Sequence, residues 1–202
     1  MRELIERYVR ELVKIPSTSN TETEKSCADY IAEELAKQPY FKEYPEQTGK
    51  YLLPEDSFGR SVPWGLVKGR NGSRKTIILT GHYDVVDTEE YGNERALAYD
   101  VEKWENLVKS GNALPGMPEE VKEDFLSGEW MFGRGTADMK GGLSVGLALL
   151  DWYGKLVVEA ERKDCGTAAF ETKTASGTEE TPEISGNLLF VTVPDEEGYP
   201  LL

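Results

Sequence analysis

Histidine, cysteine and basic runs are scarce in this chain of 202 residues. Its single histidine is His82, and its two cysteines, Cys27 and Cys165, lie too far apart for a zinc knuckle or a CxxC redox motif. Two cysteines also exclude a disulfide scaffold. No run of lysine and arginine appears and the formal net charge is −14, so no nucleic acid or anionic membrane is expected as a partner.

Long apolar runs are missing as well. Charged residues interrupt the apolar positions of residues 1–16, so no secretory signal peptide is expected there. No stretch reaches the length of a membrane span, and we therefore expect a cytoplasmic protein. The hydrophobic content of 39% is nevertheless enough for a packed core, which argues against a disordered chain.

Helical and extended segments alternate along the chain. Apolar residues at helical spacing predict a helix over 4–13 and another around Cys27, which then becomes a buried apolar side chain. The run 40–63 has no sustained period and is expected to be loop or extended structure. Further expected elements are strands over 64–68, 76–80 and 187–193, and helices over 101–109, 119–126 and 143–153.

The order of these elements indicates the fold class. Strands separated by helices rather than hairpin turns predict an α/β fold, a three-layer sandwich with a mostly parallel sheet. The unbroken apolar run 187–193 is typical of a strand covered on both faces. Residues 154–186 are rich in Thr, Glu, Ser and Gly, which predicts a flexible insertion or an exposed connection.

Polar residues follow two of the expected strands. His82 and Asp84 come directly after one strand, and Glu196 and Glu197 follow another. Ligands of such sheets bind outside the carboxyl ends of the strands. These residues, together with Asp138 before a helix, are therefore expected to meet at one rim.

Histidine and carboxylates in this arrangement suit a metal site. Asp84 can accept one N–H of the His82 imidazole and leave the other nitrogen for a metal. The two oxygens of Asp138 can bridge two cations. Of Glu196 and Glu197, one can bind metal while the other accepts a proton. Each residue alone also has an ordinary explanation, as a surface histidine, a turn or capping aspartate, or a solvated glutamate.

Two neighbouring features point elsewhere. The segment 135–140 superficially resembles a P-loop, but Met139 stands where glycine is required and Gly141 where Ser or Thr is required, so a phosphate cradle is excluded. Arg134 can hold a carboxylate, and a structural ion pair explains it at least as well.

Three segments resemble the motifs of one family when they are taken in this order. They are GlyHisTyrAspValVal, GlyArgGlyThrAlaAspMetLysGlyGly and ProAspGluGlu. They are similar to the successive motifs of the co-catalytic zinc metallopeptidases and deacylases, which include carboxypeptidase G, aminoacylase, acetylornithine deacetylase and succinyl-diaminopimelate desuccinylase. LeuValLysIleProSerThrSer is similar to the family's first segment. LeuProGluAspSerPheGlyArgSerValProTrp resembles the arginine-utilisation RocB-type branch.

This resemblance implies a metal-dependent hydrolase of amide bonds in small peptides or N-acyl amino acids. It implies that His82, Asp138 and Glu197 are ligands of two divalent metal ions, most simply zinc, although cobalt or manganese also suit such mixed ligands. It implies that Asp84 orients His82, that Glu196 is the general base and that the peptide after Asp138 is cis. Complete relatives are implied to form a homodimer through a lid domain.

The family pattern also includes an acid and a histidine further along the chain than Glu197. Without them neither metal reaches the three protein ligands that catalytic zinc normally has. We therefore expect residues 1–202 to be the N-terminal part of a metallopeptidase catalytic domain, without the lid and inactive alone. The alternatives are a non-catalytic remnant whose exposed sheet edge a partner covers, and an acidic module that binds a divalent ion without hydrolysis.

Overall fold

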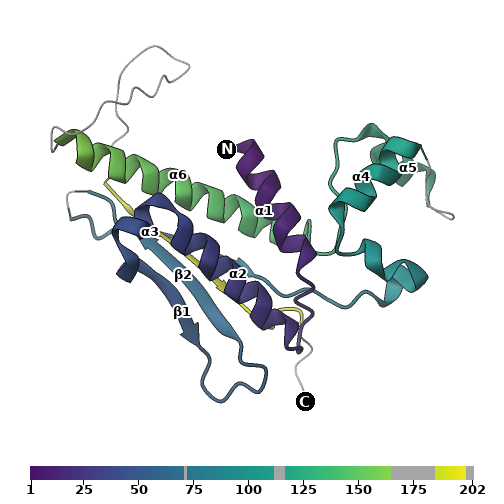
Figure 1. Ribbon diagram of the computed structural model, residues 1–202, viewed down its shortest axis with the longest axis horizontal. Coiled ribbons are helices and arrows are strands. Elements are labelled where there is room, and N and C mark those ends of the chain that lie inside the picture. Colours follow the sequence, from purple (N-terminus) through teal and green to yellow (C-terminus); the bar gives the residue numbers. More distant parts are fainter. Residues whose placement is uncertain (71, 112–116, 165–184, 199–202) are drawn as a thin grey trace, which may run out of the picture.

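A computed structural model of the chain describes residues 1–70, 72–111, 117–164 and 185–198. They form an α/β fold with a four-stranded sheet (Figure 1). The helices are α1 Arg2–Lys14, α2 Thr23–Lys37, α3 Pro39–Glu43, α4 Val101–Ser110, α5 Glu119–Ser127 and α6 Lys140–Asp164, with 3-10 segments η1 Pro45–Gln47 and η2 Glu89–Leu97. The strands are β1 Thr48–Leu52, β2 Ser61–Val67, β3 Thr76–His82 and β4 Asn187–Val193.

The sheet is mixed, with the strand order β1-β2-β4-β3. Strand β2 runs antiparallel to both β1 and β4. Strands β3 and β4 are parallel, in a register that runs from Thr76 opposite Asn187 to His82 opposite Val193. The prediction of a mostly parallel sheet is therefore wrong for the described strands. Residues 53–60 join β1 to β2 without a crossover helix, and strands joined in this way run antiparallel.

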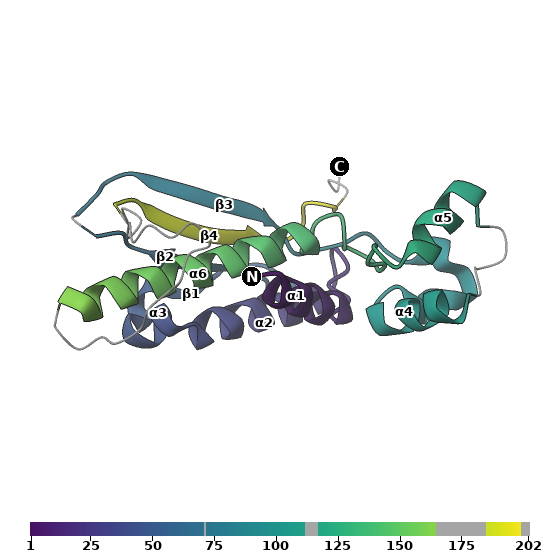
Figure 2. The ribbon, with the colours of Figure 1, turned by 90° about the horizontal axis from the view of Figure 1, so that it is seen from above.

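Helices α1, α2, α3 and α6 lie on one face of the sheet, whereas η2, α4 and α5 lie beyond its end (Figure 2). The described residues thus form two layers instead of the three expected. The side chains of Ile77 and Ile78 on the edge strand β3 are 67% and 58% exposed. In β4 only Phe190 and Thr192 are buried, so the expectation of cover on both faces does not hold within this part of the chain.

The main core lies between these helices and the sheet. Helix α6 contacts α1, α3 and three of the strands, and its residues Leu147 and Leu150 are fully buried. Cys27 on α2 is also fully buried, as the helical spacing predicts. A separate aromatic cluster joins η2, α4 and α5, where Trp104 packs edge-on against Phe125.

The expected helices over 4–13, 101–109 and 119–126 are confirmed, within a few residues at their ends. The region 40–63 is less irregular than expected, because it holds α3, η1 and β1. Residues 154–164 continue α6 rather than begin an insertion, since Leu156, Val157 and Val158 pack on the core. The remainder of that expected insertion, 165–184, lies outside the described residues, and so does Cys165. Among the described helices, none is both long and apolar enough to cross a membrane.

Candidate metal centre

The candidate site lies where β3 and β4 end and α6 begins. His82 is the last residue of β3 and is paired in register with the last residue of β4, so the acids after β4 fall beside it. Asp138 comes two residues before α6. The structure thereby brings together all five residues that the motifs single out: His82, Asp84, Asp138, Glu196 and Glu197.

The His82 imidazole is buried at the base of the site, with 5% of the residue exposed. Its Nδ1 lies 3.0 Å from the backbone oxygen of Asp84 and 3.4 Å from that residue's carboxylate. Its Nε2 lies 3.0 Å from Oδ1 of Asp138 and 3.7 Å from Oε2 of Glu196. The hydrogen bond with Asp84 outweighs burial and, with that of Asp138, raises the pKa of His82 to about 9.

Asp84 is a fully buried carboxylate that is held on every side. One oxygen accepts from the Ser19 hydroxyl at 2.7 Å and from the Glu197 N–H at 2.9 Å, and the other accepts from the Glu196 N–H at 3.2 Å. Burial alone would raise the pKa of Asp84, but the hydrogen bonds from His82, Ser19 and these backbone groups lower it to about 2. Asp84 therefore stays charged and fixes the imidazole.

The other carboxylates face outward around His82. One ligand atom each from His82, Glu196 and Glu197 lie within 4.8 Å of one another. The side chains of Asp138 and Glu196 are 74% and 60% exposed. Burial and then the charge of Asp138 raise the pKa of Glu197. An imidazole nitrogen among carboxylates that repel one another is a donor set that fits a divalent cation such as zinc.

The Asp138 segment is locked against the end of β3. The Asp138–Met139 peptide is cis, in agreement with what the resemblance implies. The Met139 side chain covers Gly81, where an added Cβ would lie 2.3 Å from the Met139 methyl carbon. A side chain at position 81 would therefore displace the Met139 side chain from the end of β3.

Arg134 does not face this cluster. Its guanidinium pairs with Glu90 and lies 5.4 Å from the ring centroid of Tyr91. Of the two roles that the sequence leaves open for Arg134, the structure shows the ion pair.

Sequence reasoning missed two buried charged groups beside the site. Glu24 on α2 is fully buried, and burial raises its pKa against the opposing effect of Arg60. The signal that could have shown its burial is its helical spacing with Cys27 and Ile31, which places it on the same buried face. Lys140 is also fully buried, its Nζ donates to the Ile15 carbonyl at 2.5 Å, and burial lowers its pKa to about 8.

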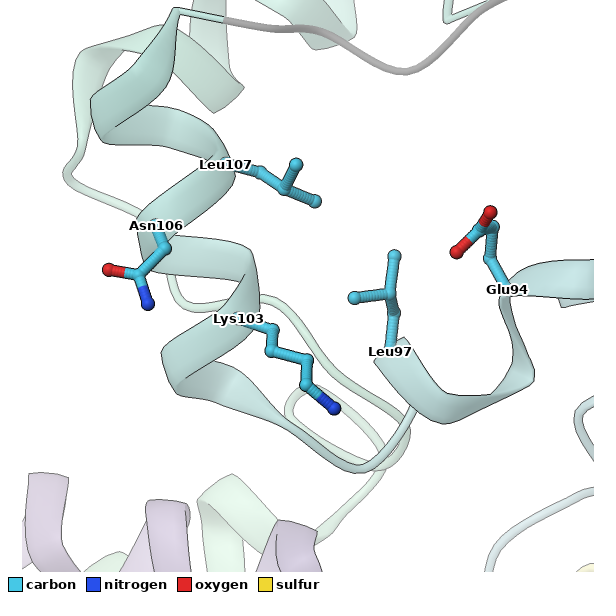
Figure 3. A pocket seen from close by; sticks show the side chains of 5 residues that line it. All are labelled: Glu94, Leu97, Lys103, Asn106 and Leu107. Atoms are coloured by element: carbon cyan, nitrogen blue, oxygen red, sulfur yellow. The ribbon is translucent and has the colours of Figure 1, made fainter.

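A hollow of about 400 Å³ lies away from these residues, between η2 and α4 (Figure 3). Its lining is mixed, because Leu97 and Leu107 point into it beside polar side chains. It contains none of the five site residues, so it belongs to the aromatic cluster of η2, α4 and α5 rather than to the candidate metal centre.

Known proteins with similar sequences cover nearly all of this chain. Protein RocB from Bacillus subtilis (strain 168) is 31% identical over 196 residues, which are 97% of this chain and 30% of RocB. The uncharacterized protein YqjN from the same organism is 35% identical over 187 residues, or 92% of this chain and 28% of YqjN. The chain therefore spans about 30% of the length of these relatives. No protein-family model matches the sequence.

Solved structures share the fold at lower sequence identity. Human carnosine dipeptidase 1 superposes with a TM-score of 0.57 and 14% identity, over 99% of this chain and 33% of that protein. The di-peptidase Dug1p from Saccharomyces cerevisiae superposes with a TM-score of 0.52 and 19% identity, with the same coverage. The described architecture is thus that of one third of each of these proteins.

Proposed function

Because this chain is a RocB-like relative of the co-catalytic zinc metallopeptidases, we propose that it carries the metal-binding part of a hydrolase that cleaves amide bonds. The observation that supports this most strongly is the gathering of His82, Glu196 and Glu197 within 4.8 Å, with Asp138 against the same imidazole. These groups come from three segments far apart in the sequence: His82 and the two glutamates lie at the carboxyl ends of the parallel strands β3 and β4, and Asp138 precedes α6.

His82, Asp138 and Glu197 would hold the metal, with Asp138 shared between two ions. Divalent ions in such a site polarise a carbonyl and supply a nucleophile at neutral pH. Two ions that share Asp138 would each have two protein ligands from this set, and catalytic zinc normally has three. We propose that further ligands come from outside the residues described here, and that hydrolysis depends on them.

Asp84 and Glu196 would act without binding metal. Asp84 is charged, buried and bonded on both oxygens, so it can hold the imidazole in one orientation while the Nε2 side faces the site. Glu196 has an exposed carboxylate that lies 3.7 Å from His82 Nε2. It can accept a proton from the attacking water and later deliver it to the leaving amine.

The proposed substrates are small peptides or N-acyl amino acids. Carnosine dipeptidase 1 and Dug1p are both named as dipeptidases, and both share this part of the fold. A second candidate is a module that binds metal or a partner without hydrolysis, which the exposed edge strand with Ile77 and Ile78 favours.

Metal titration of the 202-residue chain by calorimetry tests the proposed site. His82→Gln, Asp138→Asn and Glu197→Gln should each weaken Zn²⁺ binding at least about tenfold, since each removes a ligand. Glu196→Gln should bind within a few-fold of wild type. The remote exposed change Glu129→Gln controls for the altered net charge.

Two outcomes would overturn the assignment. Full binding by Glu197→Gln would remove it from the ligand set, and loss of binding in Glu196→Gln would make that residue a ligand rather than a base. Dipeptide and N-acyl amino acid hydrolysis at metal saturation separates the two candidate functions. Activity that wild type has and Glu196→Gln lacks supports the hydrolase, whereas metal binding without activity in the complete protein supports the module.

A further inference from the structure

Three consecutive backbone N–H groups after β4 all donate to buried carboxylates. The Asp195 N–H donates to Oε2 of Glu24 at 3.0 Å. The next two, from Glu196 and Glu197, donate to the two oxygens of Asp84 at 3.2 and 2.9 Å. The backbone of the loop that carries both glutamates is therefore fixed by hydrogen bonds to the carboxylates of Glu24 and Asp84.

Glu24 is the link between this loop and the segment that follows α1. Its second oxygen accepts from the Asn20 N–H at 2.8 Å. The neighbouring Ser19 donates its hydroxyl to Asp84 at 2.7 Å. One fully buried side chain thus fixes both the segment that holds Asp84 and the loop that carries Glu196.

Arg60 supplies the charge that makes this arrangement possible. Its Nη1 lies 3.3 Å from Glu24 and 3.3 Å from the carboxylate of Asp195, while its Nε and Nη2 bind Asp56 at 2.8 and 2.6 Å. The Arg60 side chain is only 12% exposed. Buried carboxylates need such a partner, and the planar guanidinium can serve several at once.

Asp195, in the same loop, has an unusual backbone conformation. Asp195 has φ +63°, a left-handed conformation that a residue with a side chain rarely adopts. Gly198 leaves room for it, because an added Cβ there would lie 2.1 Å from Oδ1 of Asp195. Glu24 holds the N–H of this residue and Arg60 its carboxylate, so together they account for the conformation.

We propose that Glu24 and Arg60 are positioning residues that set the loop carrying Glu196 and Glu197 over His82, and through it the affinity and geometry of the metal site. Neither residue contacts the metal or the substrate in this scheme. The part that concerns metal rests on the proposed function. The part that concerns the loop rests on the hydrogen bonds alone.

The test compares Glu24→Gln with Glu34→Gln in the full chain. Glu34 is a well-matched control, since it is a buried acid on the same helix, 6% exposed, and pairs with Arg7 at 3.0 Å far from the site. Glutamine at position 24 keeps the size, but its amide group must face one of the two N–H donors and it no longer neutralises Arg60. Arg60→Lys, with Arg7→Lys as control, provides the second pair if Glu24→Gln fails to fold.

Two readouts are needed. In metal-free protein, hydrogen exchange of the Asp195, Glu196 and Glu197 amides should be at least about tenfold faster in Glu24→Gln and unchanged in Glu34→Gln. With Co²⁺, Glu24→Gln and Arg60→Lys should bind about 10- to 100-fold more weakly, with an altered visible absorption spectrum that reports ligand geometry. The controls should keep both the affinity and the spectrum of wild type.

The outcomes separate the two proposals. Wild-type affinity, spectrum and exchange in Glu24→Gln and Arg60→Lys would overturn the positioning role while the proposed function stands. Equal weakening in the matched controls would also overturn it, since the effect would then be general stability. If wild type binds no Co²⁺, the residues of this chain do not hold a metal without the further ligands, and amide exchange alone decides whether Glu24 and Arg60 set the loop.

Discussion

The only histidine of the chain lies in the candidate site, so the pH dependence of stability can be used to test its surroundings. In the metal-free protein the hydrogen bond with Asp84 raises the pKa of His82 to about 9, against an ordinary value of 6.5. The folded state therefore holds this proton more tightly than the unfolded state does. Its contribution to stability is fully present below pH 6.5 and is lost as pH rises through 9.

The size of this contribution follows from the two pKa values. The difference between 9 and 6.5, at 1.36 kcal/mol per pH unit, corresponds to about 3 kcal/mol. The imidazole is only 6% exposed, so solvent screening takes little from that figure. Wild type should therefore lose about 3 kcal/mol relative to His82→Gln between pH 6.5 and 9.

Urea unfolding with a chelator present, at pH steps from 6 to 10, measures this difference. The comparison with His82→Gln is essential, because Lys140 has its pKa lowered to about 8 and titrates in the same range with the opposite effect on stability. Proton NMR of the one histidine gives the pKa directly. A midpoint near 6.5, or a difference between the two proteins that stays flat from pH 6 to 9, would refute the reasoning.

Other consequences concern the core, a buried charge and the exposed edge. Phe190→Ala should lower the free energy of unfolding, measured in urea, by about 3–5 kcal/mol, because this residue is 1% exposed between β4 and α6. A loss below about 1 kcal/mol would contradict that packing. Lys140→Met removes an ammonium whose pKa burial lowers from 10.5 to about 8. The free energy of unfolding of wild type should therefore rise by about 3 kcal/mol relative to this variant between pH 8 and 10.5. A constant difference would show that Lys140 is not buried as a cation. The double change Ile77→Thr with Ile78→Thr should alter the free energy of unfolding by less than about 1 kcal/mol, since both side chains are mostly exposed on an edge strand. It should also reduce self-association, measured by light scattering. A large loss of stability would place both side chains in a core.

Local patterns were sufficient for most of the elements. Apolar residues at helical spacing predict helix α1. A continuous apolar run between polar segments predicts strand β4. Strand direction and sheet cover were not predictable in this way, because both depend on contacts between distant segments. The antiparallel pairing of β2 with β4 joins residues 64–67 to 188–191, and nothing within either segment specifies its partner.

Some residues of the candidate site were likewise predictable from the sequence, and others were not. His82, Asp84, Asp138, Glu196 and Glu197 lie in short motifs whose order made their convergence predictable, and the parallel register of β3 with β4 produces it. The helical spacing of Glu24 with Cys27 and Ile31 gives a local signal for its burial. Its pairing with Arg60 was not predictable, because an ion pair between α2 and the loop before β2 joins segments far apart in the sequence.

Proton release on Zn²⁺ binding tests the central claim, that His82 is a metal ligand in a cluster of carboxylates. At pH 7.5 an imidazole with a pKa of about 9 is protonated, so the ion must displace that proton to bind Nε2. Calorimetry in buffers of different ionisation enthalpy should show about one more proton released by wild type than by His82→Gln, and the histidine resonance should stop titrating in Zn²⁺-saturated protein. Zn²⁺ binding with no proton from His82, and a resonance that titrates as it does in the metal-free protein, would contradict the account.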